Sequence, residues 1–333
     1  MPGNPYEPKT YEYTTYPRQF VSYRWYKPLL TAFLAIIIAF AMMMVVFALA
    51  FMTADTLDFI DYISSITADF STMDMYSLSG ALMTWGSIAC ILPAMAIANR
   101  IVYDRPFASM ASSRGGWNWS AFFKCLGLAA LVMGVPMVLQ SVFFPLGLSD
   151  HVIRFTLPGV IAGVLLLPVQ CVAEEYMCRG FLMQTFGSWF RLPPLAIILQ
   201  AAVFTSLHMY DIYGMTSIAI MGLAMGIVTY ITRGLEASSA CHITNNMVIL
   251  FISGLGIEGA SNETGLISLI FAAVIDIAYA VLVVIIGTRR NWFRPKADIV
   301  EKFNIKKLKK AYYMDNDEEL PLPYPPEEEK YER

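Results

Sequence analysis

The chain has 333 residues, of which 57% are hydrophobic and 15% are charged. Soluble globular domains contain about 45–50% apolar and about 25% charged residues, so a soluble fold of this size is excluded. The net charge of −3 gives no indication of nucleic-acid binding, and we expect no nucleic-acid partner. Composition therefore predicts an integral membrane protein whose main surroundings are the lipid bilayer.

Apolar stretches recur along the chain, and a helix needs about 20 residues to cross a bilayer. We predict eight transmembrane helices, at residues 29–53, 79–99, 121–142, 155–177, 194–210, 213–232, 237–255 and 265–287. The predicted fold is an all-α polytopic bundle over residues 29–290. A polar tail precedes it at 1–28, and another follows it at 291–333.

Charged residues divide between alternate loops. The 54–78 loop contains aspartates and no basic residue. In the 256–264 loop, the only charged residues are glutamates. Arg100, Arg105 and Arg114 lie in the loop between the second and third predicted spans. This loop falls on the side of the membrane opposite to the two acidic loops. By the positive-inside rule, both termini are expected in the cytoplasm.

The tails and the cysteines give four further expectations. Residues 1–28 are rich in Tyr and Pro and are predicted to form a loose tail. Lysines at Lys302, Lys306, Lys307, Lys309 and Lys310 form a basic cluster that we expect to rest on anionic lipid. The acidic, Pro-rich segment Pro321–Arg333 is predicted to be disordered. No CxxC pair occurs, so the five cysteines are predicted to be buried free thiols.

Few ionisable or amide side chains fall inside the predicted spans, where they are costly and usually functional. Those that we single out, in or directly beside the spans, are Glu174, Glu175, Arg179, His208, His242, Asn246 and Asp276. Glu175 and Arg179 lie four residues apart, so they can form an ion pair on one helix face, while Glu174 points about 100° away. The same four-residue spacing joins Phe204 to His208 and His242 to Asn246.

Three helices can thus present one glutamate, two histidines and one asparagine to a common cavity. A carboxylate can take a proton from water and make it a nucleophile. Histidine and asparagine can donate hydrogen bonds to the oxyanion that forms when water attacks a carbonyl. Alternatively, Glu174, His208 and His242 hold a zinc ion that activates the water. Both routes lead to amide hydrolysis, and the residue types fit either.

The ordered motifs Glu174-Glu175-x-x-x-Arg179, Phe204-x-x-x-His208 and His242-x-x-x-Asn246 form a recognisable set. The set resembles the CAAX-processing and bacteriocin-immunity family (CPBP, also called Abi). This family contains intramembrane endopeptidases, including the type II CAAX prenyl endopeptidase. The likeness covers about residues 155–255.

The resemblance implies a role for each motif residue. Glu174 looks like the base that activates water, with His208 as its partner or as a metal ligand. His242 and Asn246 look like the pair that stabilises the oxyanion, and Glu175 and Arg179 look like a supporting ion pair. Phe204 is expected to be a packing residue.

Other functions fit less well. The sequence contains neither the HExxH of site-2-type zinc proteases nor a GxSG typical of rhomboid-like serine proteases. A proton-coupled transporter is disfavoured because no inverted repeat is evident. A non-catalytic membrane interaction protein of the immunity or secretion type remains the alternative. Asp276 is expected to make an interhelical hydrogen bond rather than to act in catalysis.

We therefore predict a multi-pass protein of a bacterial plasma membrane that acts as an intramembrane endopeptidase. Its expected partner is a protein or peptide substrate, membrane-embedded or lipidated, cleaved near the cytoplasmic face. The sequence leaves open whether the site works without a metal or with zinc.

Overall fold

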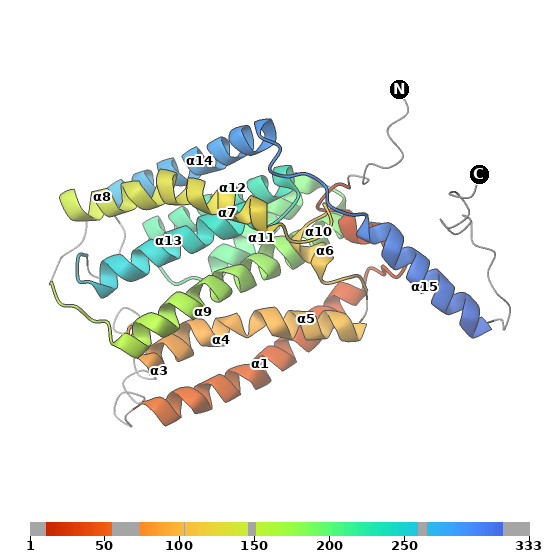
Figure 1. The fold of residues 1–333 in the computed structure, drawn as a ribbon, viewed down its shortest axis with the longest axis horizontal. Helices are drawn as coiled ribbons and strands as arrows, with labels where there is room; N and C mark the ends of the chain where they lie inside the picture. The colour runs from red at the N-terminus through yellow and green to blue at the C-terminus, as the bar shows by residue number, and fades with distance from the viewer. Residues whose placement is uncertain (1–10, 55–73, 103, 146–150, 259–264, 316–333) are drawn as a thin grey trace, which may run out of the picture.

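The computed structural model describes residues 11–54, 74–102, 104–145, 151–258 and 265–315. Figure 1 shows that these residues form a helical bundle. Within the described ranges the only extended pairing is an isolated bridge between Ser112 and Gly234. The all-α prediction is confirmed.

Helices occur at all eight predicted positions. They are α1 (Lys27–Thr53); α3 (Leu78–Ala81), α4 (Ser87–Ala89) and α5 (Ile91–Val102); α7 (Trp119–Ala129) and α8 (Val135–Phe143); α9 (Leu157–Glu175) and α10 (Met183–Phe190); α11 (Pro193–Ser206); α12 (Ile212–Thr232); α13 (Glu236–Gly254); and α14 (Leu266–Arg289). Wide π-helical turns join α3 to α4 (Leu82–Gly86), α7 to α8 (Ala130–Gly134) and α9 to α10 (Tyr176–Leu182). The short helix α6 (Ala108–Ala111) lies in the loop after α5.

Among the residues that the structure describes, six helical runs are long and apolar enough to cross a membrane. They are Lys27–Thr53, Leu78–Val102, Trp119–Phe143, Leu157–Phe190, Ile212–Thr232 and Leu266–Arg289. Of the other two predicted spans, α11 has only 14 residues, and α13 carries many polar side chains. The chain is a multi-pass membrane protein, whereas the number of eight spans and the cytoplasmic side of the termini stay predictions.

Polar residues fix where the inner helices begin and end. The Thr156 hydroxyl accepts from the Gly159 amide at the start of α9, and the Asp211 carboxylate accepts from the Gly214 amide at the start of α12. Such caps satisfy amides that have no partner within the helix. Arg233 ends α12 in the left-handed region, with φ of 59°, where its charge also suits the negative end of the helix dipole.

Helix α13 lies inside the bundle, in contact with α7, α9 and α12 (Figure 1). Helix α12 packs in turn against α11 and α14. Most residues of α13 are buried, which places its polar side chains against protein rather than lipid. This position is what allows a helix with histidine and two asparagines to lie within a membrane bundle.

The described part of the N-terminal segment is packed up to Phe20, so the prediction of a loose tail is wrong for residues 11–20. Tyr13, Tyr16 and Phe20 are buried, and a short 3₁₀ helix, η1 (Tyr16–Gln19), lies at the same end of the bundle as α15 (Ile299–Asp315) (Figure 1). The Phe20 ring meets the edge of Phe303 at 5.4 Å. Aromatic residues that looked like features of a polar tail bury apolar area here instead.

Other sequence expectations have mixed outcomes. All five cysteines are buried with free thiols, as predicted. Helix α15 carries the predicted lysine cluster. The predicted disordered segment Pro321–Arg333 and the acidic residues Asp55, Asp58, Asp61, Asp69 and Glu263 lie outside the described residues.

Candidate active site

The two glutamates of the first motif lie at the last two positions of α9, next to the π-helical turn Tyr176–Leu182. Such turns insert one extra residue into a helix and often occur at functional sites. Glu175 is fully buried, whereas the side chain of Glu174 keeps 12% of its surface exposed. The two adjacent glutamates thus differ in their exposure to solvent.

Glu175 and Arg179 form the predicted ion pair. The Arg179 guanidinium donates to Glu175 Oε1 at 3.0 Å, and both side chains are fully buried. A second guanidinium nitrogen donates to the Gly222 carbonyl at 3.3 Å, and the guanidinium carbon lies 4.2 Å from the centre of the Phe204 ring. Removal of one member of a buried pair leaves an uncompensated charge, so each partner depends on the other.

His242 reaches from α13 to both glutamates. Its Nδ1 lies 3.0 Å from Glu175 Oε1, and its Nε2 lies 3.5 Å from Glu174 Oε2. An ionised carboxylate paired with arginine can only accept a hydrogen bond, so Nδ1 is the donor to Glu175. The ring is thereby oriented with Nε2 toward Glu174, at a separation that lets a water molecule contact both groups.

Phe204 links the two histidines. Its ring centre lies 4.8 Å from that of His208 and 5.8 Å from that of His242, which it meets edge to face. His208 follows the end of α11, and its Nδ1 lies 2.8 Å from the Phe204 carbonyl. The structure therefore brings His208 to the cluster through Phe204, and its other ring contact is a stack with Tyr210 at 6.3 Å.

Asn246 lies one turn after His242 on α13 and is partly buried. The amide nitrogen of Asn245 donates to Asn246 Oδ1 at 3.0 Å. This bond occupies the oxygen of Asn246 and leaves its NH₂ group as the donor on the face shared with His242.

Sequence reasoning missed the packing that brings α11 close to α12. Gly222 and Gly226 form a Gly-x-x-x-Gly pattern, and a Cβ on Gly226 would lie 2.5 Å from the Gln200 amide nitrogen. The Gln200 amide donates at 3.0 Å to the Gly222 carbonyl, which also accepts from Arg179. The glycine spacing, typical of close helix pairs in membranes, was the signal for it.

A second buried ion pair fixes the start of α13. Glu236 accepts from the Arg114 guanidinium at 2.5 Å and from the Asn118 amide at 2.8 Å. Glu236 is fully buried, and Arg114 also lies 5.4 Å from the centre of the Phe293 ring. Since α13 carries His242 and Asn246, this pair supports the site from outside it.

The donors predicted for zinc do not gather into a metal site. Glu174 and His242 approach each other, but no group of three or more His, Cys, Asp or Glu side chains suited to a metal occurs in the described ranges. His242 Nδ1 is also held by Glu175.

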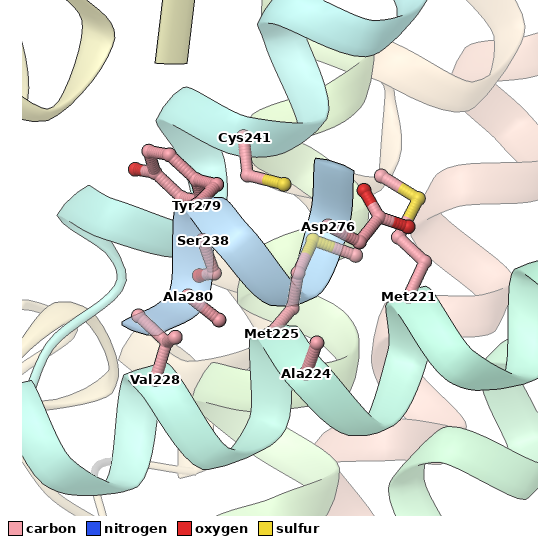
Figure 2. Close-up of a pocket in the computed structure, with 9 residues that line it drawn as sticks. All are labelled: Met221, Ala224, Met225, Val228, Ser238, Cys241, Asp276, Tyr279 and Ala280. Atoms are coloured by element: carbon pink, nitrogen blue, oxygen red, sulfur yellow. The ribbon is translucent and has the colours of Figure 1, made fainter. Parts of the chain in front are cut away.

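Asp276 corrects one expectation. It is buried on α14, yet its carboxylate has no hydrogen-bond partner among the described residues, so the predicted interhelical hydrogen bond is wrong. The side chain lines a small cavity between α12, α13 and α14, whose wall includes Ser238 and Cys241 (Figure 2).

Comparison with known proteins identifies the region that carries the motifs. Residues 154–248 match the family model described as type II CAAX prenyl endopeptidase Rce1-like. The chain is also 26% identical to the uncharacterized protein YyaK of Bacillus subtilis (strain 168) over 175 residues, which cover 49% of this chain and 58% of YyaK. The chain thus aligns with less than two thirds of that relative's length, and no solved structure matches it.

The matched residues include all seven motif positions from Glu174 to Asn246. The resemblance predicted from those motifs is confirmed, since residues 154–248 of this membrane protein are similar to the type II CAAX prenyl endopeptidase Rce1-like family.

Proposed function

We propose that the chain is an intramembrane endopeptidase in which Glu174 activates the attacking water. The observation that carries this proposal is that the two glutamates contact different ring nitrogens of His242. Glu175 binds Nδ1 and is itself neutralised by Arg179, whereas Glu174 approaches Nε2, keeps some exposure and has an Oε2 atom without a hydrogen-bond partner. A carboxylate in that position can accept a proton from water.

The reaction then proceeds in two steps. The water gives a proton to Glu174 as its oxygen bonds to the peptide carbonyl carbon. His242, with protons on both ring nitrogens, and the Asn246 amide donate to the oxyanion. The C–N bond then breaks, and the proton held by Glu174 passes to the leaving nitrogen. His208, whose ring is held by the Phe204 carbonyl, acts as the partner of Glu174 at the edge of the site.

The family resemblance and the lipid-facing bundle support a proposal for substrate and location. We propose a protein or peptide substrate, membrane-embedded or lipidated, cleaved at the cytoplasmic side of a bacterial plasma membrane. Zinc remains a separate proposal: metal analysis of the purified wild type and of His208→Ala and His242→Ala tests it. Stoichiometric zinc that is lost in both variants would support it, and full activity of metal-free protein would refute it.

The test of the activity compares cells that make equal amounts of the wild type or Glu174→Gln. Mass spectrometry of new protein N-termini and C-termini is expected to reveal ends that occur with the wild type alone. Glu301→Gln, an exposed change on α15, is the matched control and should give the wild-type ends. Identical ends for the wild type and Glu174→Gln would favour the non-catalytic interaction protein.

A further inference from the structure

Helix α15 lies beyond the end of the bundle at which α1 begins, and it runs in a different direction from α1 (Figure 1). It contributes no residue to the proposed hydrolysis. Its lysine cluster alone does not indicate which side of the helix would meet a partner. In the structure one side of α15 is occupied by protein, so the opposite side is the one left for a partner.

The occupied side of α15 packs on the N-terminal segment. Val300 and Phe303 are buried in one apolar cluster with Phe20. The Asn304 side chain also accepts a hydrogen bond from the Val21 amide at 3.0 Å. Apolar packing and a hydrogen bond on the same side fix the rotation of the helix about its own axis.

The same contacts hold α15 near the membrane surface. Val21 is bonded to Asn304 and precedes Trp25 by four residues, which span at most about 14 Å. Trp25 and Tyr26 are 66% and 44% exposed and lie directly before the apolar helix α1. Exposed Trp and Tyr at the start of a transmembrane helix are typical of the membrane–water interface. The middle of α15 is therefore held close to the level of the lipid headgroups.

The outward side of α15 combines apolar and basic side chains. It consists of Lys302, Ile305, Lys306, Leu308 and Lys309, of which the last is partly exposed and the others are exposed. Spacings of three and four residues connect these positions, so they share one side of the helix. Ile305 is 44% and Leu308 is 57% exposed, which leaves much apolar surface without a protein partner.

The charge on the outward side is positive. Among the described residues, Lys302, Lys306 and Lys309 form no ion pair. Lys307 differs from them, because its ammonium lies 5.9 Å from an aromatic ring on the occupied side. Glu301 is exposed as well, so three lysines stand against one carboxylate. Apolar side chains flanked by lysines are typical of helices that lie in the surface of an anionic bilayer.

We propose that α15 is an interfacial helix whose outward side binds anionic phospholipids at the end of the bundle where α1 begins. Ile305 and Leu308 enter the boundary between headgroups and acyl chains. Lys302, Lys306 and Lys309 bind the lipid phosphates, as lysines beside a membrane surface do. The N-terminal segment holds the helix in the required rotation. The proposal uses none of the residues assigned to peptide hydrolysis, so either can fail without the other.

The test uses the full chain in lipid nanodiscs and a spin label on α15. All five native cysteines are buried, so Leu308→Cys provides one accessible thiol for a nitroxide. Electron paramagnetic resonance measures how often the label collides with oxygen, which concentrates in lipid, and with a water-soluble nickel complex. The ratio of oxygen to nickel collisions should rise several-fold when phosphatidylglycerol is added to phosphatidylcholine. Raised ionic strength should reverse the rise, because salt screens the lysines.

Two pairs of charge variants in the labelled chain separate α15 from the rest of the protein. Lys302→Gln/Lys306→Gln should remove most of the rise, since each lysine favours contact with an anionic surface roughly fivefold. Arg289→Gln/Arg290→Gln removes the same charge from exposed positions at the end of α14 and should keep the rise.

Three results would overturn the proposal. The first is a label equally exposed to water with and without phosphatidylglycerol, and the second is a full rise in Lys302→Gln/Lys306→Gln. The third is a rise that occurs only in a chain ending at Asp315. That result would assign the lysines to the acidic residues that follow α15 in the sequence rather than to lipid. We expect the shortened chain and the full chain to respond alike.

Discussion

Helices α13 and α1 differ in burial and polarity, although both lie within the membrane bundle. Along α1, four residues are buried, and large apolar side chains such as Ile36 and Phe40 are more than 60% exposed. Helix α13 is mostly buried and carries Glu236, His242 and Asn246. Lipid can solvate the first helix, but only protein partners can satisfy the second. For this reason we expect the proposed chemistry at α13 and the helices that contact it.

The largest expected effect comes from breaking the ion pair that orients His242. Arg179→Leu leaves Glu175 charged and buried, which should lower the free energy of unfolding by about 3–5 kcal/mol and abolish cleavage. Thermal unfolding in detergent measures the first effect. Lys124→Leu, an exposed change on α7, is the control and should be nearly neutral.

The double variant Glu175→Met/Arg179→Leu sharpens this prediction. Replacing both partners by apolar groups should recover much of the stability, because no uncompensated charge remains. Cleavage should stay lost, because nothing then holds His242 Nδ1. Recovery of cleavage along with stability would show that the pair is purely structural.

The next effect concerns the oxyanion donor on α13. Asn246→Leu removes an NH₂ group without a change of backbone and should lower kcat about 10²–10³-fold, as loss of a single oxyanion donor does. Asn245→Leu removes the neighbour that only orients Asn246 and should cost clearly less. Equal losses for the two variants would contradict the role given to Asn246.

A smaller effect is expected at the contact between Tyr11 and Asp298, which joins the N-terminal segment to the start of α15. The Tyr11 hydroxyl donates to Asp298 at 2.9 Å, and partial burial together with this carboxylate raises the pKa of Tyr11 to about 12. The hydroxyl therefore keeps its proton at physiological pH. Tyr11→Phe should weaken the contact by about 1 kcal/mol and speed proteolysis of α15, with cleavage activity unchanged. Unchanged proteolysis would show that the aromatic packing alone holds the segment.

The smallest effect is expected on α1. Phe40→Ala should change the free energy of unfolding by no more than about 0.5 kcal/mol, because the ring is 64% exposed in the bundle. Phe204→Ala, at a ring that is 1% exposed, should cost about 3–5 kcal/mol. Similar values for the two phenylalanines would remove the contrast between lipid-facing and inner helices.

Much of this arrangement could be predicted from sequence. Apolar length located the helices, and four-residue spacings paired Glu175 with Arg179. Hydropathy was less informative for α13, because tertiary contacts with α9 and α7 stabilise its polar residues. The packing of Tyr13 and Phe20 was missed because short aromatic segments carry no periodic signal. Interhelical contacts such as His242 with Glu175 depend on the fold, and spacing within one helix cannot give them.

The most direct test of the central claim uses purified protein in lipid vesicles with a substrate found from the new termini. Wild type, Glu174→Gln and Glu175→Gln are compared for cleavage and for thermal unfolding. We predict that Glu174→Gln unfolds at the wild-type temperature but loses cleavage by about 10²–10⁴-fold, whereas Glu175→Gln loses stability as well. Cleavage by Glu174→Gln at the wild-type rate would contradict the account.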